Sequence, residues 1–190
     1  MNRYKLVLLG DAQVGKTSLM RRLLYGMYQE EYEPTDGVQL TSFAIQTDRG
    51  NIRFKVWDTA GQAELCGLRD GYYIGAQCAI IMVDVTSYGS YQSWHRDLVR
   101  VCNKIPVVIC GNKNEPMAER TQRNLQASFG RMNLAYYGIS VKCKTNLEKP
   151  FLYLARRLIG DPKLELLRPP KPTSLITFSK ETPPEEEHEA

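Results

Sequence analysis

The sequence predicts an α/β domain built on a six-stranded, mostly parallel sheet flanked by five helices. Short apolar runs alternate with segments of helical periodicity along most of the chain, and strands that alternate with helices usually pair in parallel. One pair of apolar runs is instead joined by Asp48, Arg49, Gly50 and Asn51, a turn typical of an antiparallel hairpin. Sheets of this class bind ligands beyond the carboxyl ends of their strands.

Each strand is expected at a short apolar run. In chain order these are residues 4–9, 38–46, 52–57, 78–83, 107–110 and 134–139. Helical patterns begin near Lys16, Tyr91, Met117 and Leu147. With 190 residues and 43% hydrophobic composition, the chain can bury one ordinary core.

The composition changes near residue 167. The segment 168–172 holds three prolines and cannot be helical, and Pro183 and Pro184 precede a run of glutamates. We therefore divide the chain into a folded domain, residues 1–167, and a flexible, Pro-rich and acidic tail, residues 168–190.

Charge is unevenly distributed over these two parts. The net charge is +4, but residues 181–190 hold five acids and no Lys or Arg, so the first 180 residues carry +9. This asymmetry indicates intramolecular contact or charged protein partners. No Lys/Arg run alternates with aromatic residues, and we expect no direct nucleic-acid partner. No apolar stretch approaches the ~20 residues of a membrane span.

The cysteines and histidines indicate no structural metal or disulfide framework. The five cysteines form no Cys-x-x-Cys pair, which is typical of reduced thiols in the cytosol or nucleus. Neither histidine has a partner at metal-ligand spacing.

Residues 10–17, Gly-Asp-Ala-Gln-Val-Gly-Lys-Thr, form a complete phosphate loop. The loop follows an apolar run and precedes a helical pattern, so helix amides and the helix dipole would face the phosphates. This context predicts a nucleoside triphosphate bound with magnesium.

A second motif, Asp58-Thr59-Ala60-Gly61-Gln62, ends the third apolar run. A carboxylate there can hold magnesium through water, Gly61 can offer its amide to the γ-phosphate, and Gln62 can orient the attacking water. Alone this motif is weak, but its spacing from a phosphate loop makes it informative.

Two further motifs follow later strands: Asn112-Lys113-Asn114-Glu115, and Ser140-Val141-Lys142. With all four motifs in this order, residues 3–167 resemble the small GTPases of the Ras superfamily. The likeness is greatest to the Ran family of nuclear transport GTPases, at residues 57–62, 67–74, 76–82, 94–102, 111–113 and 148–162.

The resemblance implies a site for GTP and GDP with Mg²⁺. Its nucleotide-binding residues would be Asp11, Ala12, Gln13, Val14, Gly15, Lys16, Thr17, Ser18, Tyr28, Thr35, Gly61, Asn112, Lys113, Glu115, Ser140, Val141 and Lys142. Thr17 and Thr35 would ligate the metal directly and Asp58 through water, with Gln62 as the catalytic residue.

The resemblance also implies a biological role. It is directional nucleocytoplasmic transport by a monomer in nucleus and cytoplasm, with importin- and exportin-type receptors, an exchange factor and a GTPase-activating protein as partners. The chain ends without a C-terminal Cys, which predicts no lipid anchor.

Three departures from the family pattern bear most directly on nucleotide binding and hydrolysis. Glu115 replaces an Asp whose carboxylate accepts both guanine N–H groups, and Pro116 restricts its backbone. Ala12 and Gln13 replace two glycines beside the γ-phosphate, where crowding would slow hydrolysis. A second interpretation is therefore a GTPase-fold binding protein with weak or absent hydrolysis. A third, an ATP-using P-loop kinase, lacks an Arg-rich lid and the matching second motif.

Overall fold

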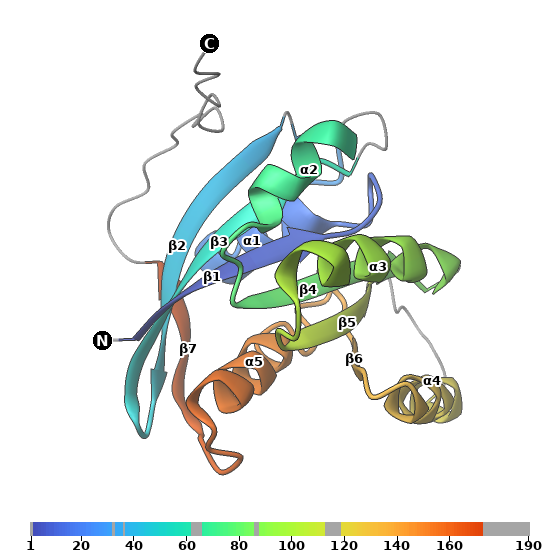
Figure 1. Cartoon of the computed structure of the whole chain (residues 1–190). Helices are drawn as coiled ribbons and strands as arrows, with labels where there is room; N and C mark the ends of the chain where they lie inside the picture. Colours follow the sequence, from blue (N-terminus) through green and yellow to red (C-terminus); the bar gives the residue numbers. More distant parts are fainter. Residues whose placement is uncertain are drawn as a thin grey trace.

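The computed structural model describes residues 2–31, 33–35, 37–61, 66–85, 88–112 and 119–172. These residues form one sheet with helices on both faces (Figure 1). Its seven strands lie in the order β6-β5-β4-β1-β3-β2-β7. They are β1 Asn2–Leu9, β2 Val38–Thr47, β3 Gly50–Thr59, β4 Cys78–Asp84, β5 Val107–Asn112, β6 Ala135–Gly138 and β7 Leu166–Pro172.

Five α-helices connect or flank these strands within the described residues. They are α1 Lys16–Tyr25, α2 Cys66–Tyr73, α3 Tyr91–Cys102, α4 Glu119–Arg131 and α5 Lys149–Ile159, with a short 3₁₀ turn, η2, at Tyr88–Ser90. Among these helices, none is long and apolar enough to cross a bilayer.

The predicted fold class is confirmed. β1 pairs in parallel with both β3 and β4, and β5 and β6 continue the parallel set. β2 and β3 form the expected antiparallel hairpin around Asp48 and Arg49. The apolar runs match the first six strands to within a few residues at each end.

The predicted strand count was wrong by one, because Leu166–Pro172 forms β7. This strand pairs antiparallel with β2 in an irregular register, from Leu166 opposite Thr47 to Pro172 opposite Phe43. Proline cannot donate to a ladder but is tolerated on an edge strand, and β7 lies at the edge. The strand also crosses the boundary that we place at residue 167, while residues 173–190 lie outside the described part of the chain.

Helix α2 carries no clear sequence signal, and the helical patterns of the sequence do not predict its start. Gly67 and Gly71 lower its intrinsic helix propensity. Tyr72 and Tyr73 at its C-terminal end are buried against the sheet, so tertiary packing supplies the stability that propensity lacks.

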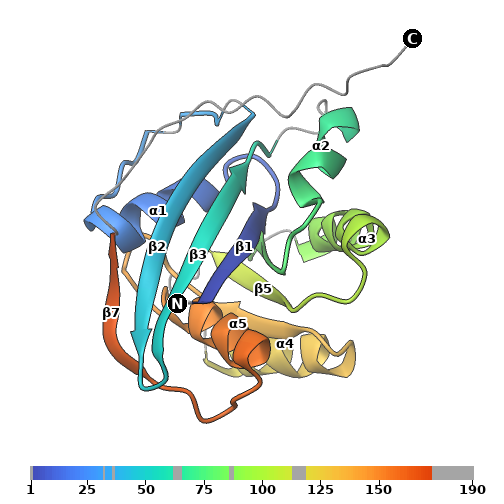
Figure 2. The ribbon, with the colours of Figure 1, turned by 60° about the vertical axis from the view of Figure 1, so that its left-hand side comes forward.

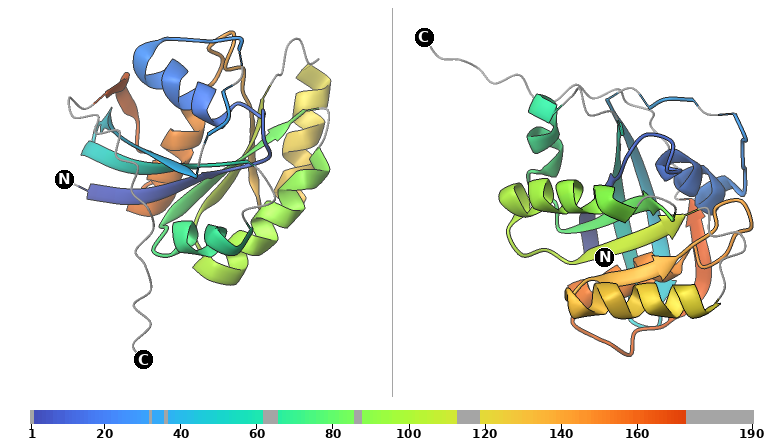
Figure 3. Two further views of the ribbon diagram at one scale, coloured as in Figure 1. Left: turned by 90° about the horizontal axis from the view of Figure 1, so that it is seen from above. Right: turned by 90° about the vertical axis from the view of Figure 1, so that its right-hand side faces the viewer.

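Two hydrophobic layers hold the sheet between helices (Figure 3). Under α1 and α5, the rings of Phe43 and Phe151 meet edge to face, with centroids 5.1 Å apart. On the opposite face, Trp94 of α3 and Phe129 of α4 pack over the central strands. Such burial on both faces is what a mainly parallel sheet requires.

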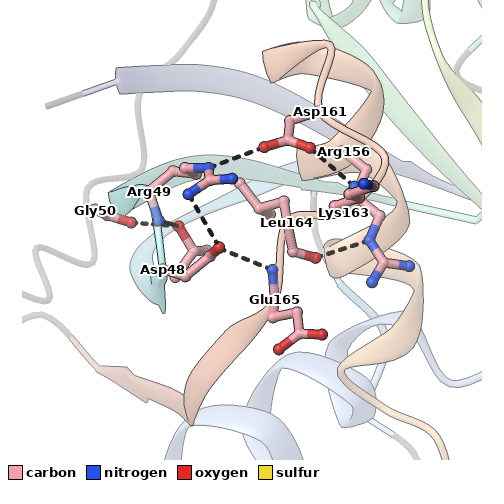
Figure 4. A network of polar contacts seen from close by, with 9 residues as sticks. Asp48, Arg49, Gly50, Arg156, Asp161, Lys163, Leu164 and Glu165 are labelled. Atoms are coloured by element: carbon pink, nitrogen blue, oxygen red, sulfur yellow. Dashed lines mark hydrogen bonds and ion pairs between the residues drawn. The ribbon is translucent and has the colours of Figure 1, made fainter.

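A polar network ties the β2–β3 hairpin to the connection between α5 and β7 (Figure 4). Arg49 donates to the Asp161 carboxylate at 2.9 Å. The Glu165 amide donates to Asp48 Oδ1 at 2.9 Å, and the Asp48 amide donates to the Glu165 carbonyl at 3.1 Å. Arg156 of α5 also donates to the Leu164 carbonyl at 2.9 Å. The start of β7 is therefore anchored at several points.

Candidate functional site

A cavity of about 1020 Å³ opens at the carboxyl ends of the parallel strands. Its lining comes from the phosphate loop and α1, from described residues between 27 and 35, from Gln39 and Thr41 of β2, from Gly61 and Asn112, and from the loop after β6. The predicted site residues among its lining are Gln13, Gly15, Lys16, Thr17, Ser18, Tyr28, Thr35, Gly61, Asn112, Ser140, Val141 and Lys142. Residues far apart in the chain are thus brought together around one space large enough for a nucleotide.

The phosphate loop needs its two glycines for steric reasons. Gly10 and Gly15 have φ values of +138° and +96°, which side chains rarely adopt. A Cβ at Gly10 would collide with the Met82 carbonyl oxygen, and one at Gly15 with the Asn112 amide nitrogen. Tight contact with β4 and β5 thus shapes the loop.

Lys16 is buried at the inner end of this loop. Its Nζ donates to the carbonyl oxygens of Gly10 and Asp11, both at 2.8 Å. These bonds orient the ammonium within the curve of the loop, where a phosphate chain would lie. A positive charge is therefore in place before any ligand binds.

The three predicted metal ligands meet beside Lys16. Thr17 Oγ1 donates to Asp58 Oδ2 at 2.6 Å and lies 2.7 Å from Thr35 Oγ1. Because the single proton of Thr17 goes to the carboxylate, Thr35 must donate to Thr17. The contact joins α1, β3 and the segment before β2.

These residues fit a magnesium ion. Hydroxyl and carboxylate oxygens are the hard ligands that Mg²⁺ prefers. Asp58 is buried, and its Oδ1 has no hydrogen-bond partner among the described residues. A buried carboxylate oxygen without a partner is costly unless a cation or its bound water satisfies it.

Burial also raises the pKa of Asp58 to about 6. The hydrogen bond from Thr17 and the charges of Lys16 and Arg21 oppose this shift without cancelling it. The charged form of Asp58 is therefore disfavoured in the metal-free protein, and a bound cation would restore it.

Asn112 links the phosphate loop to the loop after β6. Its Nδ2 donates to the Val14 carbonyl at 2.8 Å, and its Oδ1 accepts from the Val141 amide at 3.2 Å. Ser140 Oγ in turn accepts from the Cys143 amide at 3.0 Å. The resemblance predicts that Asn112 and the Val141 amide contact guanine; in the structure Asn112 joins two walls of the cavity by its bonds to Val14 and Val141.

At the mouth of the cavity, residues 28–30 approach α1 and the loop after β6. The Arg22 guanidinium lies 5.8 Å from the centre of the Tyr28 ring, and Lys142 Nζ lies 3.6 Å from a Glu30 carboxylate oxygen. Both contacts lie on the side where the base is expected.

Ala12 and Gln13 occupy the tight side of the loop. The Gly61 Cα faces the backbone of Asp11 and Ala12 so closely that a Cβ on Gly61 would overlap Ala12. Gln13 has φ +64°, a left-handed conformation that favours glycine. The two departures from glycine therefore sit where space and backbone freedom are both limited.

Trp94 is a site residue that the sequence did not reveal. Its Nε1, on α3, donates to Asp11 Oδ1 at 2.8 Å. Arg100, further along α3, makes a bidentate pair of 2.7 and 2.8 Å with Asp70 of α2. Helix α3 thus holds both the phosphate loop and the helix after the second motif, contacts for which no local pattern exists.

Gln62, Lys113 and Glu115 lie outside the described residues. The catalytic role of Gln62 and the base contacts of Lys113 and Glu115 stay predictions.

Comparison with protein families agrees with this geometry. The model of the Ras family matches residues 5–160, which include all four motifs, β2 to β6 in full and β1 from Lys5 onward. Members of this family are small GTPases that bind GTP and GDP with magnesium and are served by exchange factors and GTPase-activating proteins. The chain therefore belongs to the Ras family of small GTPases and carries the nucleotide-binding switch of that family.

Proposed function

We propose that this protein is a Ran-type GTPase that binds magnesium-GTP, hydrolyses it slowly and acts as a nucleotide switch in nucleocytoplasmic transport. The observation that carries the nucleotide part is the convergence of Thr17, Thr35 and Asp58 beside the buried Lys16. The transport role rests on the likeness of residues 57–62, 67–74 and 94–102 to the Ran family.

Each residue then has a defined task. Lys16 places its charge on the β- and γ-phosphates, and Thr17 and Thr35 hold magnesium with Asp58 behind them. When bound, the ion neutralises phosphate oxygens. Gly61 offers its amide to the γ-phosphate, and Gln62 orients the attacking water. Loss of the γ-phosphate releases Thr35 and Gly61, which changes the surface that partners contact.

The nucleotide part is tested with a fluorescent guanine nucleotide in magnesium buffer. Thr17→Asn removes a metal-binding hydroxyl and should weaken triphosphate affinity at least tenfold, whereas Thr17→Ser keeps the hydroxyl and should stay close to wild type. Equal affinity for all three proteins would contradict the proposed site.

Base specificity depends on Glu115. The longer side chain should reduce, without abolishing, the preference for guanine over adenine, because a bidentate contact is geometrically demanding. Glu115→Asp should tighten GTP more than ITP, which lacks the 2-amino group. Weaker GTP binding by Glu115→Asp would overturn this assignment.

The transport part is tested by loading the full chain with a non-hydrolysable GTP analogue or with GDP. Importin-type receptors should bind the triphosphate form preferentially, and imaging should place the protein in nucleus and cytoplasm. Equal receptor affinity for the triphosphate and diphosphate forms would contradict the transport switch but not the assignment of the protein as a GTPase.

A second candidate is a binding protein that hydrolyses GTP hardly at all and stays in its triphosphate form. The Ala12 methyl favours it, because alanine adds bulk that glycine lacks to a loop whose backbone at Asp11 and Ala12 already packs closely against Gly61, on the side that an activating arginine must approach. Single-turnover phosphate release from wild type and Ala12→Gly/Gln13→Gly, with and without a Ran-type activating protein, separates the two. If the hydrolysis rate of the double variant rises at least tenfold above wild type only when the activator is present, the result supports slow hydrolysis in wild type that is limited by crowding at Ala12 and Gln13. No hydrolysis by either protein supports the second candidate.

A further inference from the structure

Four cations lie together on the face of the sheet beside α2. The parallel register of β1 and β3 pairs Arg3 with Arg53 and Lys5 with Lys55. Because side chains alternate between faces with a period of two, all four project away from the core that contains Phe54. Figure 2 views these strands side by side at the front, with α1 behind them. We call these four residues the basic sheet face.

The described neighbours of the basic sheet face are neutral, and one of them, the Ile74 carbonyl, accepts a hydrogen bond from Lys5 Nζ at 2.7 Å. On β2, Ser42 lies opposite Lys55 and Ala44 opposite Arg53. Within the described part of the chain, no acidic side chain forms an ion pair with Arg3, Arg53 or Lys55. The charge of this face is therefore not neutralised by its own sheet.

This arrangement costs stability. Like charges directly opposite each other on neighbouring strands repel, and here two such pairs follow one another. Burial lowers the pKa of Lys5, Cys102 opposes that shift, and repulsion from Lys55 adds to it. The Arg53 Nε is buried without a hydrogen-bond partner among the described residues. Repulsion between clustered like charges has no benefit for folding, which indicates a binding surface.

We propose that the basic sheet face binds an extended, acidic segment of a partner protein. Strands lie about 4.8 Å apart, and alternate residues along a strand lie about 6.7 Å apart, so the cations form a flat two-by-two grid. An extended peptide with acids at alternate positions presents carboxylates at the same 6.7 Å spacing. Such a segment would lie along the strands and pair with two or more cations.

Other polyanions fit this surface less well. Single-stranded nucleic acid needs aromatic rings on which bases can stack. The nearest ring, Trp57, has Lys5 Nζ 3.7 Å and Lys55 Nζ 5.6 Å from its centre, so both lysines occupy positions that a base would take. A flat membrane would reach the exposed Arg3 and Lys55 but not the half-buried Lys5 and Arg53.

The test uses the full chain, a fluorescent (Glu-Ser)₅ peptide and low salt, with (Gln-Ser)₅ as the neutral control. Lys55→Glu should weaken binding of the acidic peptide at least fivefold. The same change replaces a repulsive cross-strand pair with an attractive one, so thermal stability should stay equal or rise. Lower affinity without lower stability cannot result from misfolding.

The matched control is Arg120→Glu, which changes the net charge equally at an exposed position on α4. It should leave peptide affinity within twofold of wild type. Equal effects of Lys55→Glu and Arg120→Glu, or binding of (Gln-Ser)₅ as tight as that of (Glu-Ser)₅, would overturn the proposal. Tighter binding of oligothymidylate or of phosphatidylserine vesicles, lost in Lys55→Glu, would assign the face to nucleic acid or membrane instead.

The acidic residues 181–190 of the chain are the alternative occupant that the test must distinguish from a partner segment. A variant with Glu185, Glu186 and Glu187 all changed to Gln distinguishes the two occupants. If wild type binds the peptide, the partner segment is supported. If only this variant binds it, the chain's own acidic segment occupies the face and the partner assignment is wrong.

Discussion

Gln13 shows how a single residue can store strain in the phosphate loop. Its backbone has φ +64°, and a left-handed conformation costs a non-glycine residue about 1–2 kcal/mol. Strain of this kind persists only where surrounding contacts over-determine the backbone. Here the close packing of Gly15 against Asn112 and the hydrogen bond from Asn112 Nδ2 to the Val14 carbonyl supply those contacts.

Gln13→Gly should therefore raise the free energy of unfolding by about 1 kcal/mol, measured by urea denaturation. The greater freedom of glycine in the unfolded chain offsets part of the gain. Lys144→Gly is the matched control, because Lys144 has φ +56° in a different loop. Stabilisation by Lys144→Gly alone would mean that the phosphate loop is not strained at Gln13.

Asp58 should make stability depend on pH. Its folded pKa of about 6 lies above the ordinary aspartate pKa of 3.8, so between these values the folded protein binds more protons than the unfolded chain. Stability of the magnesium-free protein should fall, relative to Asp58→Asn, as pH rises from 4 to 6, by at most about 3 kcal/mol. The measurement is denaturant unfolding of both proteins across this range with EDTA present. A constant difference between them would show that the pKa of Asp58 is not raised.

At the scale of elements, α3 connects two parts of the site. Through Trp94 it holds Asp11 of the phosphate loop, and through Arg100 it holds Asp70 of α2. The Trp94 bond is partly buried and the Arg100 pair is exposed, so the first should contribute more.

Trp94→Phe keeps the ring in the core but removes its N–H. The loss of a hydrogen bond to a carboxylate should cost about 1.5–3 kcal/mol of stability and weaken magnesium-GTP binding several-fold. Arg100→Ala should cause a smaller change in both quantities. Calorimetric unfolding and nucleotide titration measure the two effects. If Arg100→Ala proved the more damaging variant, the ordering of these contacts would be wrong.

At the scale of the whole molecule, the fold extends past its last helix. Leu164 is fully buried in the core under α1 and α5, and β7 follows directly after it. The hairpin network of Figure 4 closes this end of the sheet. The segment from Asp161 to Pro172 is thus structural, although its composition resembles that of a linker.

Shortened chains test whether the segment from Asp161 to Pro172 stabilises the fold. A chain ending after Pro172 should have a free energy of unfolding within about 0.5 kcal/mol of that of the full chain, measured by denaturant unfolding. Leu164→Ala in the full chain should cost about 2–5 kcal/mol. A chain ending after Lys163 should lose at least as much, since it lacks Leu164 and β7. Stability of the Lys163-terminated chain equal to that of the full chain would show that β7 contributes nothing.

Much of the fold and of the phosphate end of the site could be predicted from the sequence alone. Apolar runs identify the first six strands because burial on both faces demands them locally. The phosphate loop follows β1 directly and Asp58 lies at the carboxyl end of β3, so their place at the carboxyl edge comes from chain order. Lys16, Thr17 and Asp58 therefore meet as expected, and Thr35 joins them.

Only the tertiary structure decided the rest. β7 exists because β2 offers an open edge, and Trp94 reaches Asp11 only when α3 is packed on the sheet. The basic sheet face arises from the register of β1 against β3, which pairs residues fifty positions apart. Local patterns carry the periodicity that forms strands and helices, but register and edge pairing depend on long-range contacts that no short segment encodes.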